Sequence, residues 1–149
     1  MRNKGKIGFG ILISLLLIPS ILIANTWQIK LKNQLIDVEI AESQAEQRMG
    51  LGNRFSLPEG SGMLFIYRRP GERIFWMKRM HFPIDIIWLL QNKVVHVERD
   101  VQPSDPGARD SSLKRYGHGV YADMVLEVPA DYSRKYRIVI GDELEVIHR

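Results

Sequence analysis

Cysteine is absent from the 149 residues of this chain. Its absence excludes disulfide bridges, a cysteine nucleophile and any metal site built on thiolates. The chain must therefore stabilise its fold with a hydrophobic core. With 45% hydrophobic residues and a length that suits one domain, it has the composition to do so.

Signatures of the common catalytic and nucleotide-binding sites are also lacking. No glycine-rich loop is followed by Lys and then Ser or Thr, the arrangement that cradles phosphates. Gly60-Ser61-Gly62 is not the G-x-S-x-G elbow that presents a serine nucleophile. These absences favour a binding or accessory protein over an enzyme, and we expect no cofactor.

A basic stripe suited to nucleic acids is lacking as well, although the formal net charge is +4. Arg2, Lys4 and Lys6 lie at the N-terminus, and subtracting these three from the 21 basic residues leaves 18 against 17 acidic residues. The positive excess therefore belongs mainly to the head of the chain. We expect no nucleic-acid partner.

What the N-terminus does contain is a long apolar run. Residues 7–24 are 18 residues without a charge, which at about 1.5 Å per residue cross most of a hydrocarbon layer of about 30 Å. Cleavage after Ala24 would put Leu22 where signal peptidase favours a small residue. We therefore predict that residues 1–25 are a retained signal-anchor, a single transmembrane helix in the cytoplasmic (inner) membrane. The domain would face the periplasm or the exterior; a cleaved signal peptide and a secreted or periplasmic protein are the alternative.

Residues 26–149 have the pattern of a single β-rich domain. Period-two alternation predicts a hairpin over 27–40 and further strands over 63–67, 74–77, 84–90, 95–101, 120–128 and, as a last hairpin, 138–147. Ser43 and Glu46 form a capping box, which predicts one short helix ending near Met49. The expected fold is a small antiparallel β-sandwich or partly open barrel with one short helix, and residues 102–119 are expected to be a long loop.

Asp85 is the sharpest anomaly, because it stands in the most apolar predicted strand. A buried carboxylate must be paired or protonated. One interpretation is a general base or a ligand anchor at the mouth of a cleft. The other is a structural role, either an ion pair with Lys78, Arg79 or Arg48 or a cap on the connection over residues 78–82.

Aromatic and basic residues cluster around Asp85 in the sequence. We predict a ligand-binding groove formed by Asp85, Trp76, Arg48, Lys78 and Arg79, with a small molecule, a glycan or a peptide as its ligand. The alternative is that these residues form no groove: the aromatic residues belong to the hydrophobic core, and the charged side chains lie at its edge, since arginine stems often cover apolar surface.

Two other functional hypotheses use the same stretch. An envelope hydrolase would employ Asp85 with a histidine, and His81 is the nearest in sequence. A Cu(I) carrier would employ the thioethers of Met77 and Met80 with the imidazole of His81, ligands whose softness suits that ion. The alternative for both methionines is ordinary core packing.

Six segments in order give the chain a resemblance to a known family. They are Arg48 with Gly50-Leu51, Gly62-Met63-Leu64-Phe65, Phe75-Trp76-Met77-Lys78, Pro83-Ile84-Asp85-Ile86-Ile87, Val125-Leu126-Glu127-Val128 and Gly141-Asp142. This set resembles the bacterial and archaeal family called domain of unknown function 192. The resemblance implies a small, mostly β domain, often exported, with no established activity, substrate or cofactor. The chain departs from the family pattern at Arg79-Met80, where Asn-Thr is common, and at Asp131, where a glycine often stands.

Overall fold

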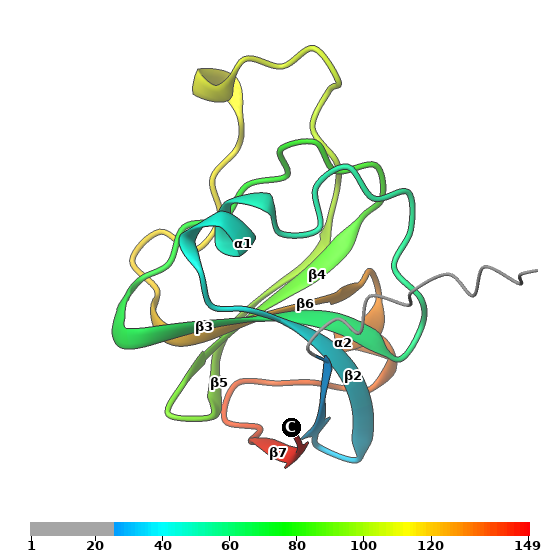
Figure 1. Ribbon diagram of the computed structural model, residues 1–149, viewed down its shortest axis with the longest axis vertical. Coiled ribbons are helices and arrows are strands. Elements are labelled where there is room, and N and C mark those ends of the chain that lie inside the picture. The colour runs from blue at the N-terminus through cyan, green and yellow to red at the C-terminus, as the bar shows by residue number, and fades with distance from the viewer. Residues whose placement is uncertain (1–25) are drawn as a thin grey trace, which may run out of the picture.

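The computed structural model describes residues 26–149, which form a mostly β domain (Figure 1). The strands are β1 (Thr26–Leu31), β2 (Gln34–Ala41), β3 (Ser61–Glu72), β4 (Ile84–Leu90), β5 (Lys93–Val101), β6 (Tyr121–Pro129) and β7 (Leu144–His148). The helices are α1 (Gln44–Met49), α2 (Tyr132–Lys135) and the short 3-10 helix η1 (Asp110–Ser112). None of the helices within 26–149 is long and apolar enough to cross a membrane. The predicted anchor over residues 7–24 lies outside the described residues.

The strands form one sheet in the order β5-β4-β6-β3-β2-β1-β7. Every neighbouring pair is antiparallel except β2 and β3, which run parallel from Asp37 opposite Ser61 to Ala41 opposite Phe65. The expectation of a wholly antiparallel sheet was therefore wrong at this pair. The reason is that α1 and the long segment after it form a crossover connection, which returns the chain in the same direction.

The sheet curls into a half-barrel, so of the two predicted architectures the partly open barrel is the nearer (Figure 1). Its two edge strands approach each other at one end. There the N–H of Val94 donates to the carbonyl of Asp142 (2.9 Å), and the N–H of Leu144 donates to that of Asn92 (2.8 Å). These bonds join the β4–β5 hairpin to the segment before β7.

Two predicted strands do not form. Within 74–77 only Phe75 pairs, in an isolated bridge to Tyr116. In the predicted hairpin over 138–147 only β7 is a strand, because the Asp142 carboxylate accepts the N–H of Val139 (2.8 Å) in a local turn. The residues between β5 and β6, yellow in Figure 1, project beyond the sheet and carry η1, in agreement with the predicted long loop.

Both faces of the central strands are buried. The alternation of β4 sends Ile87 and Leu89 into one hydrophobic cluster and Ile84, Ile86 and Trp88 into a second on the opposite face. The second cluster is completed by residues outside the sheet, among them Leu51, Phe75, Met77 and Met80. The central residues of the neighbouring strands are buried on both faces as well, Met63 to Phe65 in β3 and Val125 to Val128 in β6, and this determines the environment of the candidate site.

The helix α1 lies over the second face, against β3. Its capping box is formed as predicted: the Ser43 hydroxyl accepts the N–H of Glu46 (3.2 Å), and the Glu46 carboxylate accepts the N–H of Ser43 (2.8 Å). Gln47 Nε2 donates to the carbonyl of Ile66 (2.9 Å), which fixes the helix to the sheet. The helix ends at Met49 as predicted, and this residue is 54% exposed.

Candidate functional site

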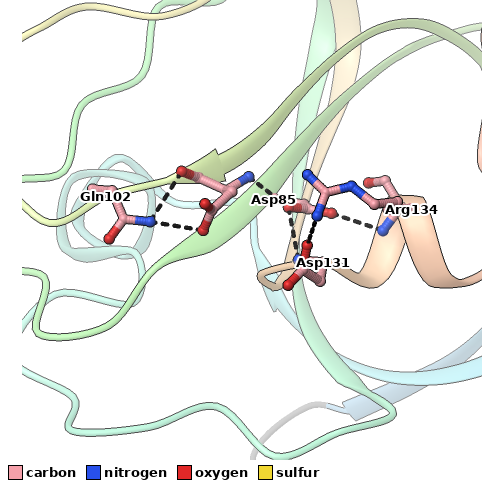
Figure 2. A network of polar contacts seen from close by, with 6 residues as sticks. Asp85, Gln102, Asp131 and Arg134 are labelled. Carbon is pink, nitrogen blue, oxygen red and sulfur yellow. Dashed lines mark hydrogen bonds and ion pairs between the residues drawn. The ribbon is translucent and has the colours of Figure 1, made fainter.

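Asp85 lies at the start of β4 and is fully buried. Its Oδ1 accepts hydrogen bonds from the backbone N–H groups of Asp100 (2.8 Å) and Asp131 (3.2 Å), and its Oδ2 accepts from that of Ser133 (2.7 Å). Figure 2 shows these bonds converging on the carboxylate between β5 and the start of α2. Backbone amides thus satisfy this group, in place of the side-chain partner that the sequence suggested.

The carboxylate of Asp85 also stabilises two unusual backbone conformations. Asp100 (φ 51°) and Asp131 (φ 66°) are both left-handed, a region that costs a non-glycine residue about 1 kcal/mol or more. The position of Asp131 is one where glycine is common in the family that the chain resembles, which fits this backbone angle. Because both carboxylate oxygens are occupied and buried, the geometry of Asp85 is that of a structural residue.

A cavity of about 250 Å³ lies under α1, on the second face of the sheet; we call it the α1 pocket. Buried side chains form its inner part: Leu51, Phe65, Phe75, Met80 and Glu127. More exposed residues of α1 and of the 74–80 segment form its mouth: Gln44, Arg48, Met49, Ile74, Trp76 and Lys78. Three of the five predicted ligand-binding residues, Arg48, Trp76 and Lys78, therefore meet at one opening.

The other two predicted residues do not line the α1 pocket. Arg79 lies beside its mouth, in a shallow depression that it shares with Arg48, Trp76 and Lys78. Its backbone is left-handed (φ 59°), a conformation that most residues other than glycine and asparagine adopt rarely. Asp85 is buried in the network described above.

Glu127 is the one acidic residue that lines the α1 pocket, and sequence analysis did not single it out. It comes from the middle of β6, between β3 and β4, and is only 6% exposed. Among the described residues its Oε2 has no hydrogen-bond partner. Burial raises the pKa of Glu127 to about 8, and the positive charge of Arg54 opposes this rise. The side chain is therefore mainly a neutral carboxylic acid near pH 7.

Gly50 lets the main chain pass close to Glu127. A Cβ at this position would lie 3.3 Å from Cζ of Phe65 and 3.9 Å from Oε2 of Glu127, and the φ of 50° disfavours a side chain in any case. The turn after α1 thus covers the carboxyl group without a side chain of its own. One feature of the sequence could have pointed to Glu127: it is a single acidic residue in the otherwise apolar segment from Val125 to Val128, which is also one of the segments that carry the family resemblance.

The mouth of the α1 pocket is rich in cations. Among the described residues, the side chain of Arg48 makes a weak hydrogen bond to the side chain of Gln44, with 3.4 Å between Nη2 of Arg48 and Oε1 of Gln44. Lys78 Nζ lies 2.5 Å from Asp110 Oδ2, and this bond holds the pKa of Asp110 below its usual value, so the pair is ionised. The Arg115 guanidinium stacks 4.2 Å from the Trp76 ring centre. Positive groups therefore outnumber negative groups at this opening, and their combined charge attracts an anion.

The residues of the two alternative hypotheses lie in different surroundings. Met77 and Met80 are 2% and 7% exposed and belong to the second hydrophobic cluster. His81 is exposed and stacks on Phe55, with ring centres 5.2 Å apart. The thioethers are thus core side chains and the imidazole is a surface group. Among residues 26–149, His, Asp and Glu side chains form no group of three that could hold a metal ion.

Comparison with known proteins gives the family. A model of DUF192, described as "Uncharacterized ACR", matches residues 27–146. The chain belongs to the DUF192 family. The resemblance on which the sequence analysis relied is thereby confirmed, and the family description assigns no activity. Among curated proteins, none matches the chain.

Two solved structures share the DUF192 fold seen here. One is a protein of unknown function from Novosphingobium aromaticivorans, with a TM-score of 0.72 and 24% identity over 80% of this chain and 84% of that one. The other is a protein from Sinorhizobium meliloti proposed to be a transcription regulator, with a TM-score of 0.72 and 20% identity over 81% of this chain and 93% of that one. At these identities the likeness establishes the fold alone.

Proposed function

We propose that this DUF192 domain is a binding module for a small organic anion, and that the α1 pocket holds the ligand. The observation that carries the proposal is the buried Glu127 carboxyl, which lines the pocket and whose Oε2 lacks a hydrogen-bond partner within residues 26–149. A polar group in such a position costs free energy unless something binds it. A ligand that enters between α1 and the 74–80 segment supplies the missing partner.

The distribution of charge supports an anionic ligand. Arg48 is exposed and has only a weak side-chain partner, so its guanidinium is available to an anion at the mouth. Lys78 can exchange the exposed Asp110 for a ligand anion at little cost, since exposed ion pairs contribute little. A cavity of about 250 Å³ lies just below the usual range of ligand pockets, about 300–1,000 Å³, which favours a small molecule over a glycan or a peptide.

The lining of the α1 pocket favours binding over catalysis. It contains one carboxyl group, Glu127, and lacks histidine, serine and cysteine. The remaining reactive groups are unsuited to proton transfer or attack, because Lys78 is paired with Asp110 and burial raises the pKa of Tyr67 to about 12. Asp85, on which the hydrolase hypothesis relies, has both oxygens engaged by backbone amides. The copper hypothesis lacks support in turn, because Met77 and Met80 fill the core.

An anion screen tests the proposed function. The full-length chain, purified in a mild detergent, is melted in the presence of small carboxylates, phosphates and sulfonates and of their uncharged analogues. A ligand at about 100 times its dissociation constant stabilises the protein by about 2.7 kcal/mol, so anions should raise the melting temperature and uncharged analogues should not.

Two variants localise the effect. Arg48→Gln should weaken binding of the best anion about tenfold, because a charge-assisted contact contributes about 1.5–3 kcal/mol. Lys93→Gln is the matched control, since Lys93 is exposed and pairs with Glu143 away from the pocket. Equal affinity of Arg48→Gln and the wild-type chain, or loss of binding in Lys93→Gln, contradicts the placement of the site.

The cellular position of the module is a second part of the proposal. We propose that residues 7–24 anchor the chain in the cytoplasmic membrane and that the domain faces the periplasm or the exterior. The first strand begins at Thr26, directly after this run, so an anchored domain would lie close to the bilayer.

Cell fractionation tests the anchor. The chain should remain in the membrane fraction after an alkaline carbonate wash and should be digested by protease added to spheroplasts. Recovery of a shortened chain in the soluble periplasmic fraction would instead support the cleaved signal peptide.

A further inference from the structure

The α1 pocket has cationic side chains at its mouth and an acidic side chain at its buried end. An anion bound at the mouth gives no hydrogen-bond partner to the acidic side chain. Arg48 and Lys78 lie at the opening, whereas Glu127 lies among the buried side chains. A carboxylate or phosphate placed against Glu127 would be repelled when that side chain is ionised. Near pH 7, where Glu127 is mainly a neutral acid, the cations Arg48 and Lys78 decide the orientation, because they attract the anionic end of the ligand to the mouth. The end that meets Glu127 is then uncharged.

We propose that the ligand is a small hydroxylated aromatic carboxylate, bound with its hydroxyl on Glu127, its ring between the aromatic walls and its carboxylate at Arg48. This inference rests on the proposed function, because it names the ligand of the same pocket.

The walls of the α1 pocket favour a flat ring. Phe65 and Phe75 are buried and meet edge to face, with ring centres 4.9 Å apart, and Tyr67 and Trp76 complete the lining. A ligand ring placed among them gains both apolar burial and the offset or edge contacts that aromatic groups prefer. The small volume suits a single ring.

The buried end favours a hydroxyl group. A hydroxyl both donates and accepts, so it can bind Glu127 as a neutral acid or as a carboxylate. The charged and titratable groups around Glu127 are Arg54, which is paired with Glu39 (2.5 and 2.8 Å), Tyr67 on β3, and Arg48 and Lys78 at the mouth. Burial raises the pKa of Tyr67 to about 12, so it stays neutral and adds no negative charge at physiological pH.

Matched ligand pairs test the inference by calorimetric titration of the full-length chain in detergent. The pairs are 4-hydroxybenzoate with benzoate and 4-hydroxyphenylacetate with phenylacetate; 4-hydroxybenzyl alcohol serves as the analogue without a carboxylate. The hydroxylated member should bind on the order of tenfold more tightly in at least one pair, the gain expected from one hydrogen bond to a buried group. The alcohol should bind more weakly than either hydroxylated acid.

Variants of Glu127 assign the preference to this side chain. Glu127→Leu should abolish the preference for the hydroxylated member while it still binds the unsubstituted acid, because Arg48 and the ring walls remain. Glu127→Gln should keep the preference, since an amide also donates and accepts. A preference that persists in Glu127→Leu overturns the inference.

These titrations, together with the anion screen described above, separate this inference from the proposed function. Equal binding of both members of each pair by the wild-type chain overturns the hydroxyl assignment and leaves the anion pocket intact. Binding of phosphates or aliphatic acids with no binding of aryl carboxylates overturns the aromatic assignment alone. If no anion of any class binds, the proposed function fails together with the inference.

Discussion

Replacement of Asp85 by asparagine should lower the free energy of unfolding by about 3 kcal/mol. The reason is that three backbone N–H groups converge on this buried carboxylate at 2.7–3.2 Å. An amide offers one oxygen in place of two, and its NH2 group faces a donor. At least one buried N–H is left without an acceptor, and the bonds that remain lose the assistance of the charge.

The effect should extend beyond the lost bonds. Asp100 and Asp131 have left-handed backbones and donate to Asp85, so the variant also releases the local conformations at the end of β5 and before α2. Chemical denaturation of the wild-type and variant chains measures the difference. Asp110→Asn is the matched control, because that carboxylate is exposed and its ion pair with Lys78 contributes little. A variant as stable as the wild-type chain would contradict the structural role and return Asp85 to the list of candidate ligand-binding residues.

The stability of the wild-type chain should fall as the pH rises from about 4.5 to about 8, because of Glu127. Burial raises the pKa of this carboxyl group from its ordinary 4.5 to about 8 in the folded state. In this window the folded chain holds the proton and the unfolded chain has released it, so the folded state binds more protons and higher pH favours unfolding. The loss of stability is absent below pH 4.5 and complete by about pH 8, and within this window the slope is about 1.4 kcal/mol per pH unit.

Glu127→Gln isolates this contribution, because glutamine has nearly the same shape and no proton to lose. The difference in free energy of unfolding between the two chains should grow in favour of the variant from pH 5 to pH 8, as measured by urea denaturation at each pH. Groups that titrate in both chains cancel in the difference. A difference independent of pH would show that Glu127 is ionised in the folded state throughout.

Glu127→Leu should stabilise the domain further, since it removes a buried carboxyl group whose Oε2 has no hydrogen-bond partner in the part of the chain that the structure describes. A residue that lowers stability and lines a pocket is typical of a functional site, where fold stability is reduced in exchange for binding. The same variant should lose the hydroxyl preference described above. We therefore expect Glu127→Leu to be more stable than the wild-type chain and to discriminate less between the hydroxylated and the unsubstituted acids.

Much of the strand pattern could be predicted from local periodicity. The strand predicted over 84–90 is β4, and the capping box at Ser43 correctly placed α1. Prediction failed where tertiary contacts override local preference. Residues 74–77 have strand-like composition, yet they form a single bridge at Phe75, because they serve as part of the cover over the second face.

The sequence by itself determined that the chain is a mostly β DUF192 domain, and that Arg48, Trp76 and Lys78 are candidates for one site, because these inferences depend on residue types and short spacings. Only the tertiary structure distinguished the surroundings of the two carboxyl groups, Asp85 and Glu127. The amides that satisfy Asp85 lie 15 to 48 residues away in the chain. The layer that buries Glu127 is built from α1 and the 74–80 segment, far from β6 in sequence. Burial and hydrogen-bond partners arise from such long-range contacts, and a local sequence pattern does not contain them.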